Sequence, residues 1–204
     1  MATRPYEQRQ RAEAAEQTRR TILDAVIERL REAPSEPVSV DRIAEMAGVA
    51  RSTVYAIFGS RAGLFDAVAA DVLEREDYER LLDAKREPDA REHMRVGFRT
   101  ATEMLAADRD VVRALFSMAQ LDERAVGEAI GRREERRSAG MARLAGRLAE
   151  QNLLRPDVSA EDAERILWVL TSFESFDLLH TGRGMSSEAV AELLFATAER
   201  ALLK

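Results

Sequence analysis

Five residues in the short segment 51–56 have side chains suited to an anionic and chemically patterned surface. They provide one cation, three hydroxyls and one small apolar group: Arg51, Ser52, Thr53, Tyr55 and Ala56. Cations and hydroxyls bind phosphates and base edges, and a small apolar group can contact a thymine methyl. A helix that only faces solvent more often carries Glu and Lys, yet residues 39–60 contain no lysine. Arg51 is the only charged residue from 46 to 60, so an anionic partner would meet no local repulsion there. We therefore expect this segment to read DNA.

Two short helices that meet at a sharp turn must hold these side chains. Ser39 is suited to cap a helix over 40–47, because its hydroxyl can accept a backbone N–H that has no partner within the helix. Gly48 supplies the left-handed residue that ends a helix without a Cβ penalty. Val54 and Phe58 lie four apart on the second helix and give it one apolar face. Two helices joined by a short turn with Gly form a helix-turn-helix. An ordinary helical hairpin is the alternative.

The composition favours an all-α fold and argues against an enzyme. The 204 residues are 46% hydrophobic and 33% charged, with 5% aromatic residues and five prolines. The chain has no cysteine, and its two histidines, His93 and His180, lie 87 positions apart. These facts argue against a disulfide framework, a metal site and a paired-histidine catalytic site. The sequence also shows no nucleophile elbow and no phosphate-binding loop. We expect no catalytic residues, no metal and no cofactor.

The charge is unevenly divided along the chain. The net charge is −6, but residues 1–65 carry ten arginines against nine acidic residues. The acidic excess lies beyond residue 65 and can face away from DNA, because exposed charges are screened beyond about 10 Å. The longest run without a charge is nine residues, 52–60, which is too short to span a membrane. The N-terminus lacks the apolar segment of a secretory signal, so we expect a cytoplasmic protein without membrane association.

Apolar periodicity and breaking residues predict about nine helices and no strand. Residues 1–17 are expected to form a flexible arm, followed by a helix over 18–31, the two short helices, and a fourth helix over 61–76. The larger C-terminal part is expected to contain helices near 88–105, 110–121, 123–152, 159–180 and 186–203. The long helix over 123–152 carries Arg132, Arg133, Arg136 and Arg137, which we expect to form a solvated face.

This order of parts resembles the tetracycline repressor (TetR) family of bacterial transcriptional regulators. The likeness is specific over residues 18–68, and beyond them only the helix order and a late Gly-containing turn agree. It is carried by Ile22-Leu-Asp-Ala25, Ser39-Val-Asp-Arg-Ile-Ala, Ala47-Gly-Val49, Ser52-Thr-Val-Tyr55, Phe58 and Arg61-x-x-Leu64.

The resemblance implies a helix-turn-helix DNA-binding domain over 18–65, with the motif at 39–58, and a ligand-binding and dimerisation domain over 66–204. A homodimer would place two recognition helices in successive major grooves of double-stranded DNA at a palindromic operator, about 34–36 Å apart. A small-molecule effector would release this repressor from its operator. The alternative is a helical dimeric scaffold or a small-molecule-binding protein without sequence-specific DNA binding.

The resemblance also assigns roles to single residues. Ser39 and Tyr55 would contact phosphates, Arg51 and Ser52 would meet base edges, and Arg61 stands where the family usually has Lys. Ala56 replaces a larger residue, which either costs a backbone contact or provides contact with a thymine methyl. The full set of expected DNA contacts is Ser39, Arg42, Arg51, Ser52, Thr53, Tyr55, Ala56 and Arg61.

Two further sets of residues are expected in the C-terminal domain. The last two predicted helices carry more apolar surface than one core requires, and their expected dimer contacts are Ile166, Leu170, Val190, Leu193, Leu194 and Thr197. These residues could instead pack within one subunit. The expected ligand contacts are Phe98, Phe116, Met118, Trp168, Phe173, Glu174 and Asp177. The two carboxylates in this set would suit a cationic or hydroxylated ligand, although exposed polar positions or dimer-interface hydrogen bonds are the alternative for them.

Overall fold

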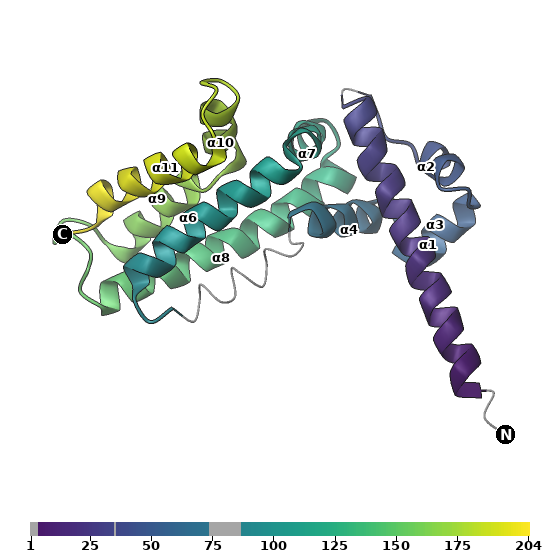
Figure 1. Ribbon diagram of the computed structural model, residues 1–204, viewed down its shortest axis with the longest axis horizontal. Helices are drawn as coiled ribbons and strands as arrows, with labels where there is room; N and C mark the ends of the chain where they lie inside the picture. Colours follow the sequence, from purple (N-terminus) through teal and green to yellow (C-terminus); the bar gives the residue numbers. More distant parts are fainter. Residues whose placement is uncertain (1–3, 35, 74–86) are drawn as a thin grey trace. The chain divides into compact units, whose positions relative to one another are not determined.

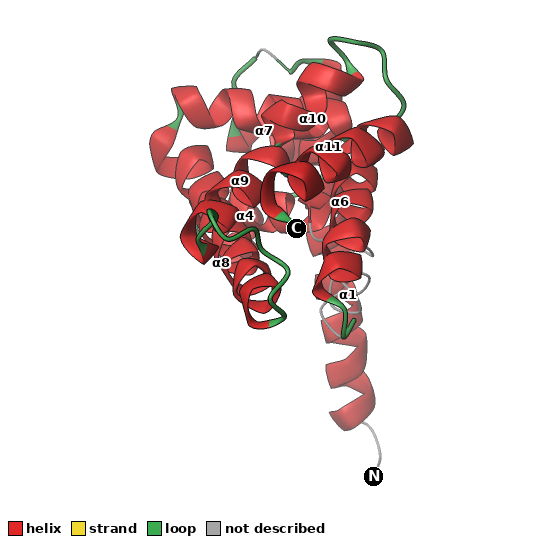
Figure 2. Ribbon diagram, turned by 90° about the vertical axis from the view of Figure 1, so that its left-hand side faces the viewer, coloured by secondary structure: helices red, strands yellow, loops and turns green. Residues whose placement is uncertain are grey.

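The computed structural model describes residues 4–34, 36–73 and 87–204, and these residues form helices joined by turns (Figures 1 and 2). The all-α prediction is confirmed. The described elements are α1 (Arg4–Glu32), α2 (Val40–Met46), α3 (Arg51–Phe58), α4 (Arg61–Leu73), α6 (Ala90–Ala107), α7 (Arg109–Leu121), a π-helical turn η1 (Glu123–Gly127), α8 (Glu128–Glu150), α9 (Ala160–Leu170), α10 (Phe173–His180) and α11 (Ser187–Leu202). Residues 1–3 of the predicted arm and 74–76 of the predicted fourth helix lie outside the described residues. None of the helices described is long and apolar enough to cross a membrane.

The chain folds into two compact units. Unit 1 contains the residues up to 72 together with 113–130, and unit 2 contains 73–112 and 131–204. The first unit therefore extends past the predicted boundary at residue 65 and takes in a second segment of the chain. Most of α7 and the start of α8 belong to unit 1, whereas the rest of α8 belongs to unit 2.

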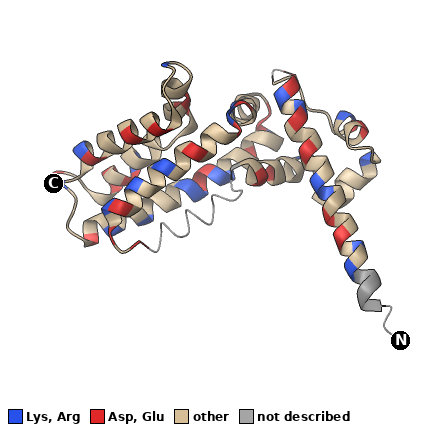
Figure 3. Cartoon of the chain, in the orientation of Figure 1, with Lys and Arg blue, Asp and Glu red and all other residues tan. Residues whose placement is uncertain are grey.

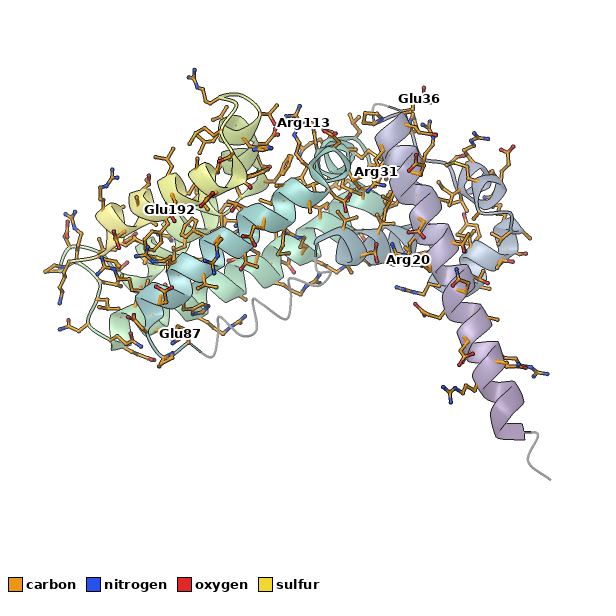
Figure 4. The ribbon with its side chains drawn as sticks, in the orientation of Figure 1. Arg20, Arg31, Glu36, Glu87, Arg113 and Glu192 are labelled. Atoms are coloured by element: carbon orange, nitrogen blue, oxygen red, sulfur yellow. The ribbon has the colours of Figure 1, made fainter. Side chains whose placement is uncertain are left out.

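The core of unit 1 forms around one stripe of α1. Its buried residues follow helical spacing and include Ile22, Val26 and Leu30, each 0% exposed. This helix packs on α2, and Arg20 of α1, labelled in Figure 4, forms an ion pair with Asp71 of α4.

The N-terminal segment differs from the flexible arm expected for residues 1–17, because α1 begins at Arg4. Residues 7–17 consist mostly of Ala, Glu, Gln and Arg, which are strong helix formers. An ion pair between Arg9 and Glu13, at 3.0 Å and four residues apart, adds to helix stability. Local propensity therefore extends α1 toward the N-terminus.

In unit 2, α11 lies alongside α6 and also contacts α9 and α10 (Figure 1). Phe98 of α6 and Phe195 of α11 meet edge to face, with ring centroids 6.4 Å apart. The helix predicted over 159–180 is two helices, α9 and α10. The break occurs because the Ser172 hydroxyl accepts the N–H of Ser175 at 3.2 Å and caps α10.

Candidate functional site

The turn between α2 and α3 is fixed by backbone hydrogen bonds. Ser39 has extended dihedrals, and its hydroxyl accepts the N–H of Arg42 at 3.2 Å, which confirms the predicted N-cap. After α2, the N–H of Val49 donates to the Ala44 carbonyl at 2.9 Å. Gly48 has a φ of +66°, and a Cβ there would meet nothing within 4 Å. The turn therefore requires glycine for its backbone conformation and not for lack of space.

One face of α3 is held by the protein, which turns the other face outward. Val54 is 2% exposed, and the guanidinium of Arg19 in α1 lies 5.8 Å from the ring centre of Phe58. Arg51 and Ser52, at the start of α3, are exposed. No side chain caps this helix at Ala50, and an uncapped helix N-terminus favours an anion.

Arg51 has a carboxylate beside it that the sequence did not reveal. Its Nη1 lies 3.0 Å and 3.1 Å from the two carboxylate oxygens of Asp41 in α2. Its guanidinium also lies 5.6 Å from the ring centre of Tyr55 and reaches the phenol oxygen at 3.5 Å. The Tyr55 hydroxyl first, and the Asp41 charge next, raise the pKa of Arg51, so this side chain stays charged. Any anion that binds Arg51 must compete with Asp41.

Arg61 is engaged by its own unit. It forms an ion pair with Asp122, it donates to the Val38 carbonyl at 3.2 Å, and it covers the ring of Phe65 at 5.0 Å. Its side chain is 29% exposed. In this structure its guanidinium therefore joins the segment before α2 to the residue before η1, in place of the outward orientation expected of a phosphate contact.

Unit 2 contains a cavity of about 560 Å³ lined by residues of α6, α8 and α9. Its size lies within the range of pockets that bind small organic molecules. Five arginines of α8 line it, and Figure 3 shows basic residues repeated along this helix. The described residues that line it are His93, Met94, Gly97, Phe98, Ala101, Met104, Leu105, Arg133, Arg136, Arg137, Ala139, Gly140, Met141, Arg143, Leu144, Arg147, Leu167 and Thr171.

Comparisons with known proteins agree with this geometry. A sequence profile of bacterial regulatory proteins of the tetR family matches residues 22–68, which include α2, the turn and α3. Among solved structures, NalD of Pseudomonas aeruginosa, the secondary repressor of the MexAB-OprM multidrug efflux pump, is 26% identical, with a TM-score of 0.74 over 94% of this chain and 98% of NalD. The chain therefore carries a TetR-family DNA-binding domain. It is a DNA-binding transcriptional regulator.

Other TetR-like folds are more distant. A putative fatty acid metabolism regulator of Clostridium perfringens is 20% identical, with a TM-score of 0.70 over 90% of this chain and 99% of that one. FadR of Bacillus subtilis, solved in complex with stearoyl-CoA, is 14% identical, with a TM-score of 0.68 over 89% and 97% of the two chains. A search of curated protein sequences found no significant match.

The structure places the expected DNA contacts of this TetR-type domain in three settings. Ser39, Arg42, Arg51, Ser52 and Ala56 are exposed, and Thr53 and Tyr55 are half-buried beside them. Arg42 forms an ion pair with Glu45 at 2.8 Å within α2. Arg61 lies apart from this set, in the internal contacts described above.

The expected ligand contacts are mostly elsewhere. Phe98 lines the cavity, whereas Phe116 and Met118 belong to unit 1. Phe173 is 7% exposed and Glu174 is exposed, and neither lines the cavity. Trp168 is 40% exposed outside the lining, and the guanidinium of Arg137 covers its ring at 5.1 Å.

Asp177 is held within the protein. One of its carboxylate oxygens accepts from Arg109 at 3.0 Å and from the Thr181 hydroxyl at 2.8 Å. Both charged side chains are about one-fifth exposed or less, at 21% for Arg109 and 17% for Asp177. These protein partners already use this carboxylate, and Asp177 does not line the cavity. The structure therefore gives no support to the expectation that it recognises a cationic ligand.

The expected dimer contacts divide according to their side of each helix. Val190 and Leu194 are 0% and 6% exposed, so they belong to the core of unit 2 and are not part of an outer surface. Ile166 and Leu170 are half-buried, and Leu193 and Thr197 are exposed. Among the described residues of unit 2, the large apolar side chains that are exposed are Trp168, Val169, Leu178 and Leu193, of which only Leu193 was expected at an interface.

Sequence reasoning also missed the basic wall of the cavity. Arg133, Arg136 and Arg137, expected on a solvated face, line it together with Arg143 and Arg147. Their spacing places these arginines on one helix face together with Gly140 and Leu144, but it does not tell whether that face meets solvent or a cavity.

Proposed function

We propose that this chain is a repressor that binds a palindromic operator as a homodimer and leaves it when a small molecule occupies the cavity of unit 2. The observation that supports DNA reading best is the geometry of α3. Its apolar residues are packed against unit 1, while Arg51, Ser52 and Ala56 remain exposed on one side. A helix of this kind can enter a major groove as a rigid body.

The surroundings of α3 supply contacts to the DNA backbone. The Ser39 oxygen already accepts an N–H, so its own proton can be donated to a phosphate. The Tyr55 hydroxyl and the uncapped first turn of α3 lie on the same side of the motif as Arg51. These groups would fix the register, and Arg51, with its bidentate donor geometry, would read guanine.

The DNA flanking the gene of this protein provides the test, in a gel-shift assay with a scrambled duplex as reference. Arg51→Ala should lose roughly tenfold or more of its affinity for the preferred duplex, with a smaller loss on the scrambled one. Arg165→Ala is the matched control, because Arg165 is an exposed arginine of unit 2, paired with Glu161. An unchanged preference in Arg51→Ala would exclude base reading by this residue. Absence of any preference in the wild-type protein would favour the non-DNA-binding scaffold.

The exposed apolar residues of unit 2 are our candidates for the dimer surface. Val169 is 52% exposed, Leu178 71% and Leu193 40%, on three helices that contact one another. Large exposed apolar groups gathered on neighbouring elements are typical of protein interfaces. Sedimentation of Leu178→Asp should show a monomer. Leu121→Asp is the control, because Leu121 is 89% exposed in unit 1 and its replacement should leave a dimer.

Release by a ligand requires that the ligand, when bound in the cavity, favours a dimer whose two α3 helices no longer fit successive major grooves of the DNA. Coupling of this kind typically amounts to about 1–3 kcal/mol. The same coupling must act in reverse, so operator DNA should weaken ligand binding by an equal factor. Titration of the ligand with and without operator DNA tests this equality.

A further inference from the structure

We propose that the cavity of unit 2 binds an amphipathic anion, which is a carboxylate or phosphate attached to an extended apolar body. Its role as the effector rests on the repressor function proposed above. The choice of ligand class rests separately on the chemistry of the cavity wall.

One side of the cavity is apolar and buried. Met94 and Leu167 are 0% exposed, and Phe98 is 2% exposed. Met104 and Met141 add thioether side chains, which are unbranched and adapt to ligands of irregular shape. This side removes an alkyl chain or ring system from water but offers little for a polar group to bind.

The other side is basic. Arg133, Arg136, Arg137, Arg143 and Arg147 all come from α8, and none of the described residues that line the cavity is acidic. Like charges three or four residues apart on one helix repel one another, so this arrangement costs stability unless something compensates it. Glu134 offsets part of this repulsion through its ion pairs with Arg133 and Arg137, and an anion in the cavity would offset more of it.

Two of the arginines are positioned by the protein. Arg137 donates to the Trp168 carbonyl at 2.6 Å and to the Thr171 hydroxyl at 2.8 Å, and it forms an ion pair with Glu134. Glu134 also pairs with Arg133 at 2.9 Å, so one carboxylate serves two arginines. These contacts hold the guanidinium groups in place before a ligand arrives, which lowers the entropy cost of binding.

Several neutral groups contact Arg147. It contacts Nδ1 of His93 at 2.7 Å and donates to the carbonyls of Glu87 and Pro88, the latter at 3.1 Å. Glu87, labelled in Figure 4, contributes its backbone here. Carbonyl and imidazole partners orient a guanidinium without cancelling its charge, so these contacts leave a positive charge at this end of the cavity.

Arg143 lies at the exposed rim, and among residues 4–34, 36–73 and 87–204 it has no ion-pair or hydrogen-bond partner. Guanidinium groups bind carboxylates and phosphates through two parallel hydrogen bonds. The pairing of this basic wall with an apolar floor therefore selects a ligand with both properties. A neutral lipid would offer these guanidinium groups no opposite charge, and a cation would be repelled.

The test uses the full chain and probes of matched length: dodecanoate and dodecyl phosphate as anions, dodecanol as the neutral probe, and dodecyltrimethylammonium as the cation, each below its micelle concentration. Isothermal titration should show at least one of the anions binding tenfold or more tightly than dodecanol, with the cation weaker still. Arg136→Gln and Arg143→Gln should each weaken that anion about tenfold and leave dodecanol unchanged. Arg165→Gln, outside the cavity, should behave as wild type.

Equal affinity for anion and alcohol, or no binding of either anion, would overturn the proposal. Unchanged anion binding in both glutamine variants would overturn it as well. Thermal melting of both variants shows whether they remain folded, so that a loss of binding is not mistaken for unfolding. Failure of the proposed function would give a different result. The anion would bind with the expected preference over dodecanol, but the complex with operator DNA would stay intact. That result would contradict ligand-induced release from DNA and still support the proposed ligand class.

Discussion

Replacing Asp41 by Asn should strengthen DNA binding, because it removes the carboxylate that competes for Arg51. The two side chains form an exposed pair, 67% and 58% accessible, with oxygen and nitrogen 3.0 Å apart. Such a pair adds little to folding, so Asp41→Asn should unfold close to the wild-type temperature. In binding, however, Arg51 of the wild type must leave Asp41 before it meets DNA. Its release in the variant should raise operator affinity by about two- to fivefold per half-site.

The salt dependence of DNA binding provides a second and more specific test of the effect of Asp41. Each phosphate that a protein neutralises contributes about 0.9 to the slope of log affinity against log salt. In the wild type, the negative charge of Asp41 lies beside Arg51 and offsets one positive charge of the surface that faces the DNA phosphates. The slope for Asp41→Asn should therefore be steeper by up to about 0.9 per half-site.

Fluorescence anisotropy with a labelled operator duplex, over a series of salt concentrations, measures both quantities. Asp157→Asn is the control, because Asp157 forms a similar exposed pair with Arg155 in unit 2, with a separation of 3.0 Å. Weaker binding by Asp41→Asn would show that Asp41 orients Arg51 for DNA, which is the opposite of competition. An unaltered slope and affinity would show that the pair has no influence on binding at all.

Three further predictions concern stability. Gly48→Ala should cost about 1–2 kcal/mol in denaturant unfolding, since φ there is +66°, whereas Gly146→Ala, in helix α8 with open space around it, should gain about 0.5–1 kcal/mol. Ser39→Ala should lower unfolding free energy by about 1 kcal/mol through loss of the cap of α2. The hydrogen bond from the Ser159 hydroxyl, at 2.6 Å, lowers the pKa of Asp162, so its charged form favours the folded state. That contribution should be present at neutral pH and vanish as pH falls through the folded-state pKa, which an NMR titration of the Asp162 carboxyl carbon would follow; Asp162→Asn should then match wild-type stability only at acid pH.

The helix-turn-helix could be predicted because its determinants are local. Ser39 needs only a backbone N–H three residues later, and Gly48 needs only its own dihedral freedom. The pairing of Arg51 with Asp41 could not be predicted in the same way, because the two residues are ten apart and meet only after the turn has set the angle between the helices. The break between α9 and α10 lay within reach, since Ser172 is a recognisable cap.

The cavity and the surfaces of unit 2 depend on which helices face one another. A basic helix face has the same sequence pattern whether it meets bulk water or a hollow, so the arginines of α8 gave no sign of their location. Leu193 and Leu194 show the same limit, because neighbouring residues of one helix point in different directions: the first is 40% exposed and the second 6%. Sequence periodicity identifies a broad apolar face, but it does not divide that face between core and surface.

The internal anchoring of Arg61 bears on how chimeric regulators can be built from this protein. Asp122, its ion-pair partner, comes from the 113–130 segment that belongs to unit 1. A graft that joins the first 72 residues to a foreign sensor would leave that segment behind and strip the guanidinium of its carboxylate. A workable fusion must either carry residues 113–130 across as well or supply an acidic residue in the new sensor at the corresponding place.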